Sequence, residues 1–401
     1  MRYRWLVLGL AAVALLASRA HLVRAEDAIA ESARAEEAFR FDAARFEKGE
    51  LRYIDGIPVM LLQGSPEEIG RQHGTLAAKA VAPFTALPKE ILKEHGVEGA
   101  WPLVAAASRT LVKRVSEDHQ REMATMIETS GIDRDMITVG NTMLELRRLG
   151  GCSALVAVGG RSATAGPLFG RNLDFPTHGV LHKFGLVLIV RPDGKHAFVS
   201  VGMPGAVGVS SGMNDSGLSV AALDVYESAD ESSMFDAEGV PLMFCYRRLL
   251  EECASVDEAE KLMRTLKPTT WANLVVCDAK EAAVFELTPK SLVVRRPDDG
   301  LLACTNHFRT KELACSMECW RYDRLDLARK AKRFDVAAVH DYMHAVNQGE
   351  WTTQTMVFEP AALKLHVAMG RGPATALPLK TLEMEELFRT GRFADAKAQS
   401  K

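Results

Sequence analysis

The sequence changes character abruptly at Gly150-Gly151-Cys152, and this junction limits the possible folds more than any other feature. Before it, residues 65–149 carry helical patterns that are interrupted near Gly96, Gly99 and Gly131. After it, short apolar runs separated by turn residues are typical of β-strands, and blocks of helical pattern lie between them. This order predicts a layered α+β sandwich, in which helices cover sheets.

Local signals predict the individual elements. A hairpin is expected over Leu51–Gln63, because two apolar runs flank Asp55-Gly56, a pair favoured in two-residue turns. Ser65–Glu68 predicts a helix start, with serine as the N-cap and proline at the first helical position, and Ser255–Glu258 predicts a second capping box. The other predicted strands are SALVAVGG (153–160), LFGRNLDF (168–175), LVLIV (186–190), AFVSVG (197–202), GLSVAALDV (217–225), LVVCD (274–278), AAVFEL (282–287), SLVVRR (291–296), LLACT (301–305) and a final hairpin of TMVFEP (355–360) and LKLHVAMG (363–370), with a turn at 191–194 and helices over 241–254, 316–330 and 335–347.

The first 25 residues resemble an export signal. Arg2 and Arg4 precede an uncharged apolar run from Trp5 to Ala17, and Val23–Ala25 offers small residues at the −3 and −1 positions of a cleavage site. A run of 13 residues is shorter than the ~20 needed to cross a bilayer. A cleaved signal and a periplasmic or secreted protein with no stable membrane span are therefore expected; an uncleaved signal that anchors the protein is the alternative. Residues 26–48 are charged and alanine-rich, as in a surface helix or a loosely held leader.

Charge and cysteine content narrow the partners and the redox chemistry. The chain has 49 basic and 52 acidic residues, a formal charge of −3, so no nucleic-acid partner is expected. Removing the four arginines of the leader would change this charge from −3 to −7. Seven cysteines leave at least one unpaired. If Cys152 is that thiol, the other six could form up to three disulfides in an oxidising compartment; alternatively, several of them are free buried cysteines. Cys315 and Cys319 are expected on one helix.

Cys152 allows two interpretations. It can be a small buried residue that begins a strand. Alternatively, the chain is cut at Gly151-Cys152, which makes Cys152 a new N-terminus. A free α-amine has a pKa of ~7.7–8.0 and a thiol ~8.5, so the amine is well matched to accept the thiol proton. A glycine before the cut would tolerate a strained backbone at the bond to be broken.

Four segments at and after this junction follow one another in an order that is typical of a known family: Gly151-Cys152-Ser153, Gly170–Asp174, Gly212–Leu218 and Thr305–Phe308. Together they resemble the cysteine-type N-terminal-nucleophile (Ntn) hydrolases, specifically the penicillin acyltransferase-like branch, and more distantly the choloylglycine hydrolases and acid ceramidase. The resemblance covers roughly residues 51–372. It implies a four-layer αββα sandwich, autocatalytic release of Cys152 and no metal or organic cofactor. The resulting segments, 26–151 and 152–401, would stay associated, with 51–151 and the second segment in one Ntn-hydrolase domain.

The resemblance also implies roles for residues near Cys152. Asp174 would hold the α-amine, and Arg171 would orient the thiolate or the substrate carbonyl; a purely structural Arg–Asp pair is the alternative. Because the two lie at i and i+3 of a strand, a bulge or the strand end would be needed to bring both inward.

Three further residues complete the predicted site. Asn306 would donate its amide to the oxyanion, or it caps a turn. Asp224 falls where relatives carry a polar residue near the oxyanion hole, and its role could concern self-cleavage. Arg321 or Arg324 would be the late arginine of the site, against ordinary surface arginines.

The resulting prediction is an exported amidohydrolase that cleaves the linear amide of a small-molecule N-acyl substrate through Cys152. Three alternatives stay open: acyl transfer to an amine acceptor, a non-catalytic exported binding protein of the same fold, and a papain-like protease with a Cys152–His307 dyad. The apolar segment Trp101–Leu111 could line an acyl pocket or form core. Two histidine pairs have metal-ligand spacing but no nearby third ligand, so no metal site is predicted: His178/His182 and His340/His344.

Overall fold

The computed structural model of the protein describes residues 39–146, 151–315 and 318–393. The predicted signal peptide and residues 26–38 lie outside these ranges. Where the expected leader helix enters the described part, Ala44–Phe46 instead form strand β1, so the helical prediction is wrong there. Within the described ranges, no helix combines the length and the apolar character needed to cross a membrane.

Two sheets form the centre of the molecule. Within the described residues, sheet A has ten strands and sheet B has six. In spatial order, sheet A consists of β1 (Ala44–Phe46), β2 (Gly49–Ile54), β3 (Ile57–Gly64), β6 (Leu186–Pro192), β7 (Phe198–Gly202), β8 (Ser211–Asn214), β9 (Ser219–Asp224), β10 (Ala272–Cys277), β11 (Ala282–Leu287) and β12 (Leu292–Arg295). Sheet B consists of β13 (Leu301–Cys304), β4 (Gly151–Ala157), β5 (Leu168–Asp174), β14 (Thr352–Glu359), β15 (Lys364–Met369) and β16 (Lys380–Glu383). In sheet A, β3 and β6 pair in parallel, whereas β4 and β5 of sheet B form an antiparallel hairpin.

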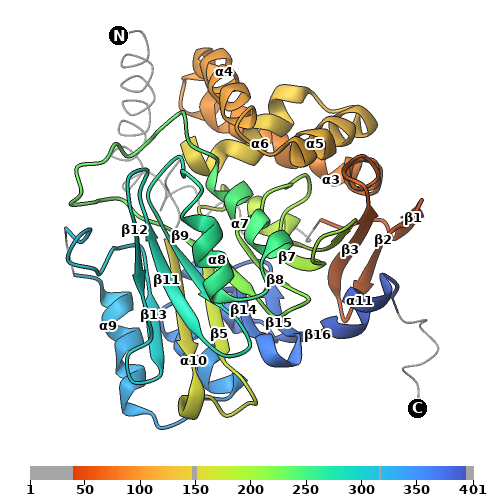
Figure 1. Ribbon diagram of the computed structural model, residues 1–401. Helices are drawn as coiled ribbons and strands as arrows, with labels where there is room; N and C mark the ends of the chain where they lie inside the picture. The colour runs from red at the N-terminus through yellow and green to blue at the C-terminus, as the bar shows by residue number, and fades with distance from the viewer. Residues whose placement is uncertain (1–38, 147–150, 316–317, 394–401) are drawn as a thin grey trace, which may run out of the picture.

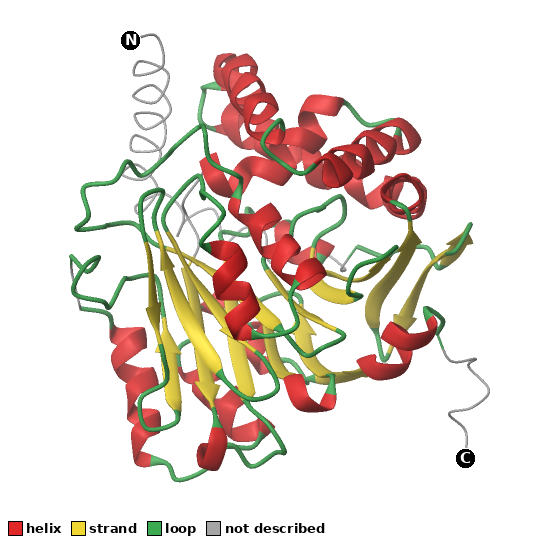
Figure 2. Ribbon diagram, in the orientation of Figure 1, coloured by secondary structure: helices red, strands yellow, loops and turns green. Residues whose placement is uncertain are grey.

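Helices cover the outer face of each sheet (Figures 1 and 2). The α-helices of the described residues are α3 (Pro66–Glu94), α4 (Trp101–Val112), α5 (Glu117–Ser130), α6 (Arg134–Leu146), α7 (Leu242–Glu252), α8 (Val256–Met263), α9 (Trp320–Asp326), α10 (Val336–Ala345) and α11 (Met384–Thr390). The buried residues of α11 belong to the core between the sheets instead. Residues of α3, α5, α7 and α8 share one apolar core with sheet A. Residues of α9 and α10 share another core with sheet B, and a third core fills the space between the sheets. The layers therefore run helix, sheet, sheet, helix, which confirms the predicted αββα sandwich.

Several local predictions are confirmed for the expected physical reasons. Asp55 and Gly56 both have positive φ, 49° and 86°, as a two-residue hairpin turn requires. Ser65 and Glu68 form a complete capping box at the start of α3. At α8 the box is only half formed: Ser255 caps the helix, but the Glu258 carboxylate accepts from the N–H of Ala254. The short strands β8 and β16 and the helix α11 were not predicted.

The hypothesis of up to three disulfides is wrong, whereas the alternative of free buried cysteines is confirmed. All seven cysteines lie in the described residues and all are free thiols. Cys245, Cys253, Cys277 and Cys304 are buried in apolar cores, where they pack as small hydrophobic side chains. Cys315 and Cys319 do not share a helix, because α9 begins only at residue 320.

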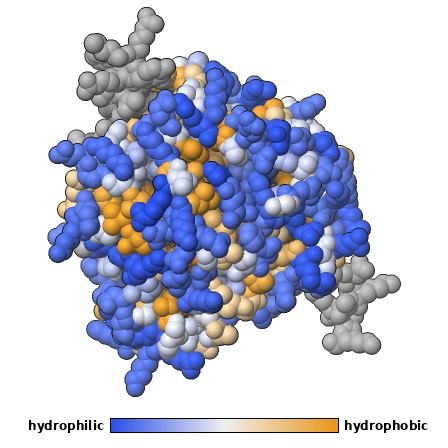
Figure 3. Space-filling model, viewed as in Figure 1, coloured by the Kyte–Doolittle hydropathy of each residue, from blue (hydrophilic) through white to orange (hydrophobic). Residues whose placement is uncertain are grey.

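The face of the molecule seen in Figure 1 is mostly hydrophilic, with an apolar patch in the region of β12 (Figure 3). This strand ends sheet A, and its residues Leu292–Arg295 are only half-buried. The α4 helix contributes few buried residues and packs mainly on α6.

Candidate active site

Cys152 is the second residue of β4, and its side chain points into the space between the two sheets. Cys152, Ala154 and Val156 alternate along β4 and all belong to the inter-sheet core. Cys152 is only 4% exposed. In the hairpin with β5, it lies opposite Leu173, and Gly151 lies opposite Asp174. The predicted nucleophile therefore lies at the end of a buried hairpin, next to Asp174.

Asn306 and Arg321 hold the main chain of Cys152. The Cys152 N–H donates to Oδ1 of Asn306 at 2.8 Å, and Nη2 of Arg321 donates to the same oxygen at 2.7 Å. Nη1 of Arg321 donates to the carbonyl oxygen of Cys152 at 2.5 Å. The other end of the Asn306 amide, Nδ2, donates to the carbonyl oxygen of Asp224 at 2.8 Å. Nδ2 carries a second hydrogen, for which no acceptor is found among the described residues.

Arg171 places a buried positive charge beside the thiol. Its Nε donates to Oγ of Ser211 at 2.5 Å, and its Nη1 donates to the carbonyl oxygen of Asn172 at 2.8 Å. Burial raises the pKa of the Cys152 thiol above its ordinary value, while the charge of Arg171 and a hydrogen bond from it act in the opposite direction. In the intact chain the thiol is therefore protonated at neutral pH. The guanidinium of Arg171 would stabilise the thiolate once it forms.

Asp174 is the last residue of β5 and is fully buried. Its Oδ1 accepts from Oγ1 of Thr352 at 2.5 Å, and its Oδ2 accepts from Nε2 of Gln348 at 2.9 Å. Nη1 of Arg321 lies 3.8 Å from Oδ2. Burial raises the pKa of Asp174, and these hydrogen bonds and charges act against that rise.

Arg171 and Asp174 do not point to the same side, contrary to the sequence-based expectation. Arg171 follows Phe169 on the face toward sheet A, whereas Asp174 lies on the opposite face, beside Gly151. A register shift does occur, but in the neighbouring strand β14 between Thr352 and Gln354. Within the described residues no ion pair joins Arg171 to Asp174, so the alternative of a structural Arg–Asp pair is wrong. Asp174 approaches the Cys152 main chain through Arg321 instead.

Gly151 is required for space rather than for an unusual backbone angle. It is absent from the glycines with positive φ in the described residues, so the predicted strain argument has no support. A Cβ built on Gly151 would instead overlap the side-chain amide of Gln348 and lie 2.9 Å from its Cδ.

Two buried side chains of sheet A, missed by the sequence analysis, fix the loop that carries Asn306. Nδ2 of Asn273 donates to the main-chain carbonyls on both sides of Asn306, each at 2.9 Å. Glu286, directly opposite Asn273 in the sheet, accepts from the N–H groups of Arg309 at 2.8 Å and Thr310 at 3.1 Å. A buried Asn and Glu inside otherwise apolar strands were the available signal. Thr352 and Gln348 were also missed, because no local pattern singles them out.

Of the remaining predicted residues, Asp224 and Arg321 lie at the site, whereas Arg324 and His307 make no hydrogen bond to Cys152 in the described residues. Asp224 ends β9, and its carbonyl oxygen accepts from Asn306, while its negative charge raises the pKa of Cys152. Arg321 is buried in the site, whereas Arg324 is exposed. His307 is half-buried, and burial lowers its pKa. No hydrogen bond joins His307 to Cys152 in the described part of the chain.

A cleft of about 520 Å³ opens beside these residues. Arg321, Gln348 and His307 contribute to its lining, together with Trp320, which is 60% exposed. Arg321 and Gln348 also contact Cys152 and Asp174, so the cleft adjoins the candidate nucleophile. The segment Trp101–Leu111 is not part of this lining. Among the described residues, no group of three or more His, Cys, Asp or Glu side chains could hold a metal ion.

Comparison with models of known protein families identifies the family of this chain. The family described as "Acyl-coenzyme A:6-aminopenicillanic acid acyl-transferase" matches residues 161–370, just over half of the 401 residues. The chain belongs to this acyl-transferase family. Membership confirms the family predicted from the motifs. The matched range begins after Cys152 and contains the other predicted site residues: Arg171, Asp174, Asp224, Asn306 and Arg321.

Individual relatives of this acyl-transferase family member are distant. An uncharacterized protein from Archaeoglobus fulgidus is 24% identical over 360 residues, which cover 74% of this chain and 59% of that protein. The chain thus spans less than two thirds of this curated relative.

Three solved structures are also similar to it. They are a mutant conjugated bile acid hydrolase from Clostridium perfringens (TM-score 0.43, 14% identity, 59% of this chain and 93% of that chain), a Caenorhabditis elegans ortholog of N-acylethanolamine-hydrolyzing acid amidase (0.42, 18%, 52% and 93%) and penicillin V acylase from Agrobacterium tumefaciens (0.38, 15%, 57% and 84%).

Proposed function

We propose that this protein is an exported amidohydrolase that cleaves the linear amide bond of a small N-acyl substrate, with Cys152 as an N-terminal nucleophile. The observation that carries the proposal is the set of contacts around Cys152: Asn306 on its N–H, Arg321 on its carbonyl and Arg171 beside its thiol. These groups can position a nucleophile, hold its α-amine and stabilise negative charge on a carbonyl oxygen. Membership of an acyl-transferase family supports the same chemistry.

The first reaction is a self-cleavage at Gly151-Cys152. The Sγ atom of Cys152 attacks the carbonyl carbon of Gly151, the bond from that carbon to the Cys152 nitrogen breaks, and the thiol proton goes to the nitrogen. The product is a thioester between Gly151 and Cys152 with a free α-amine. Water then hydrolyses the thioester, leaving a Gly151 carboxylate and a free thiol.

Turnover repeats this chemistry on a substrate. In the intact chain the N–H of Cys152 donates to Oδ1 of Asn306 at 2.8 Å, and the α-amine formed by the cut would be held by the same oxygen. This α-amine takes the proton of the thiol. The thiolate attacks the substrate carbonyl, and the second hydrogen of Asn306 Nδ2 stabilises the oxyanion. The α-amine returns the proton to the leaving amine, and water releases the acyl group. The charge of Arg171 stabilises the thiolate before attack.

Acyl transfer to an amine is the second candidate, and the description of the family favours it. The cleft beside Arg321 and Gln348 can admit water or an amine to the thioester. Adding amines during turnover distinguishes the two reactions: a transferase forms a new amide at the expense of free acid, whereas a hydrolase does not.

Export and the fate of the fragments belong to the same proposal. Residues 1–25 would be removed as a signal, and segments 26–151 and 152–401 would remain together after the cut. Two contacts across the cut support their association. Strand β3 pairs with β6 from Val59–Val187 to Gly64–Pro192. Helix α5 is joined to α7 by the buried ion pair of Glu122 with Arg247 and by a hydrogen bond between His119 and Glu251.

Mass spectrometry of the purified protein tests the proposal. Two fragments meeting at 151/152 are expected, and an acid quench during turnover is expected to leave the second fragment heavier by one acyl group on Cys152. A single uncut chain that never acquires an acyl group would instead support a binding protein. A papain-like enzyme would be acylated without a cut and would lose activity when His307 is replaced with alanine.

Replacing Asn306 with alanine is expected to slow turnover about 10²- to 10³-fold, the usual loss when one oxyanion donor is removed. Asn306→Asp keeps the oxygen that accepts from Cys152 and Arg321 but cannot donate, so it is expected to be equally slow. Steady-state kcat/KM with a chromogenic N-acyl anilide measures both. Activity of Asn306→Asp near the wild-type level would limit Asn306 to holding the main chain. Asn214→Ala is the matched control: it removes a buried asparagine that donates to the carbonyls of Leu250 and Cys253, and it should lower stability with little change in kcat/KM.

A further inference from the structure

The side chain of Gln348 lies so close to Gly151 that no residue with a Cβ atom fits at position 151 without a steric clash. A Cβ on Gly151 would overlap Nε2 of Gln348 and lie 2.9 Å from its Cδ and 3.3 Å from its Oε1. The space on this side of the Gly151 α-carbon is therefore already filled by one side-chain amide.

Gln348 is not free to move aside. Its Nε2 donates to Oδ2 of Asp174 at 2.9 Å, and its backbone N–H donates to Oγ1 of Thr352 at 2.7 Å. Thr352 itself donates to the other oxygen of Asp174 at 2.5 Å. Displacing the amide would break a hydrogen bond to a buried carboxylate, which is among the more costly hydrogen bonds to lose.

The intact chain also shows where an acyl group would lie. In the proposed self-cleavage, the Gly151 acyl group is transferred to Sγ of Cys152, and the resulting thioester is chemically an acyl-enzyme with a free α-amine. A substrate acyl group on the same sulfur has its α-carbon in the place of the Gly151 α-carbon. The rest of that acyl group can extend into the adjoining cleft of about 520 Å³, which Gln348 also lines.

We propose that Gln348 determines specificity by admitting acyl groups with an unsubstituted α-carbon and rejecting those that carry a substituent in the position of an L side chain. The proposal rests on the proposed Cys152 chemistry and adds the class of acyl group to it. If the acyl chain occupies the place of the Gly151 nitrogen, the rejected methyl-branched acyl group is the (R) enantiomer.

A matched set of 4-nitroanilides tests the proposal during turnover: hexanoyl, (R)-2-methylhexanoyl and (S)-2-methylhexanoyl. The wild type is expected to prefer hexanoyl over the (R) compound by about 10- to 100-fold in kcat/KM, the loss that corresponds to one hydrogen bond to a charged group. In Gln348→Ala this ratio is expected to fall to within a few-fold of unity. The ratio of the two kcat/KM values is the readout. Loss of the hydrogen bond from Gln348 to Asp174 would slow the cleavage of all three substrates by the same factor and leave this ratio unchanged. Equal ratios in the wild type and the variant overturn the proposal.

Self-cleavage provides a second arm that needs no foreign substrate. Gly151→Ala is expected to be cut about 10- to 100-fold more slowly than the wild type, and Gly151→Ala combined with Gln348→Ala is expected to be cut faster than Gly151→Ala alone. Circular dichroism verifies that each variant is folded. A double variant as slow as Gly151→Ala contradicts the proposal. If the wild type itself is neither cut nor acylated, it is the proposed function that fails.

Discussion

Replacing Cys152 with alanine is expected to leave the chain uncut and to lower kcat/KM for amide cleavage roughly 10⁴- to 10⁶-fold, as when the nucleophile of a concerted catalytic group is removed. In the proposed mechanism both effects follow from one sulfur atom, which attacks Gly151 first and the substrate afterwards. The side chain is 4% exposed and lies in the inter-sheet core, so alanine fits without disturbing the hairpin. Denaturing electrophoresis, intact mass and kinetics with an N-acyl anilide measure the two losses.

Two controls make this result specific. Cys152→Ser keeps a nucleophile of similar size and is expected to be cut slowly rather than not at all. Cys304→Ala removes another buried sulfur from the same core, on the strand β13 that pairs with β4, and it should be cut at the wild-type rate. A Cys152→Ala protein that is still cut at residue 151 would mean that another protease makes the cut. Unchanged turnover by that variant would disprove the nucleophilic role of Cys152.

The parts of the fold that were predictable depend on interactions close in sequence. The turn at Asp55-Gly56 and the cap at Ser65 are decided by neighbouring residues, so the sequence pattern is sufficient to identify them. The order of the strands was not predictable in this way. The parallel pairing of β3 with β6, for example, joins segments that are separated, in the described residues, by four α-helices and two strands of sheet B.

In the candidate site, too, residues that belong to local motifs were predictable and residues defined only by distant contacts were not. The motifs that drew attention to Cys152, Asn306 and Arg321 lie far apart in sequence, and the fold joins them by direct hydrogen bonds. Gln348 could not be found, because its contact with Asp174 spans 174 residues and its neighbours form no motif. The reason for a glycine at position 151 was likewise misjudged, since its steric partner is that same distant side chain.

The faces of β5 illustrate a third kind of limit. Strand alternation correctly indicates that residues three apart point to opposite sides. The expectation that a bulge or the strand end must bring both Arg171 and Asp174 inward assumed that both contact Cys152 from one side. In the structure, Arg171 lies beside the thiol, and Asp174 reaches the main chain of Cys152 from the other face through Arg321. A strand end allows this arrangement, because a side chain there can reach around the last residues of the sheet.

Replacing Glu122 with alanine is expected to lower the free energy of unfolding by about 3–5 kcal/mol, the usual cost of removing one partner of a buried ion pair. Arg247 donates to both carboxylate oxygens of Glu122, at 2.8 and 2.6 Å, and to Glu251 at 2.8 Å. The side chains of Arg247 and Glu122 are 2% and 3% exposed, so the remaining charge could not be solvated by water. Urea unfolding of the cleaved protein, followed by circular dichroism, measures the loss.

A surface ion pair provides the control. Lys79 binds Asp42 at 2.5 Å, but these side chains are 83% and 66% exposed, so Lys79→Ala should leave the unfolding curve unchanged. A loss below 1 kcal/mol in Glu122→Ala would contradict the expected cost.

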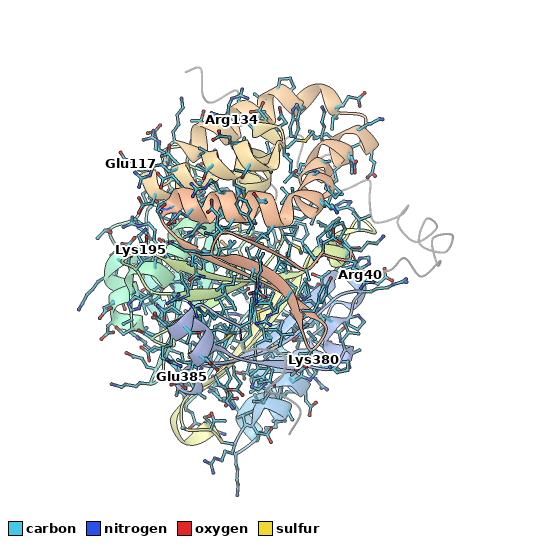
Figure 4. The ribbon with its side chains drawn as sticks, turned by 90° about the vertical axis from the view of Figure 1, so that its right-hand side faces the viewer. Arg40, Glu117, Arg134, Lys195, Lys380 and Glu385 are labelled. Carbon is cyan, nitrogen blue, oxygen red and sulfur yellow. The ribbon has the colours of Figure 1, made fainter. Side chains whose placement is uncertain are left out.

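The position of this ion pair connects stability with the proposed self-cleavage. Glu122 lies on α5, before the cut, whereas Arg247 and Glu251 lie on α7, after it. His119 and Glu251 form a second contact between these helices at 3.0 Å, and Lys195 joins Glu251 at 3.0 Å. Figure 4 shows Lys195 and Glu117, the first residue of α5, on the same side of the molecule. Because no peptide bond would link the two segments after cleavage, the Glu122→Ala protein should release its 26–151 fragment at a lower urea concentration than the wild type. Simultaneous loss of both fragments' structure at an unchanged urea concentration would mean that other contacts across the cut, such as the β3–β6 pairing and the hydrogen bonds of Asn141 with Gly205 and Val207, hold the fragments together.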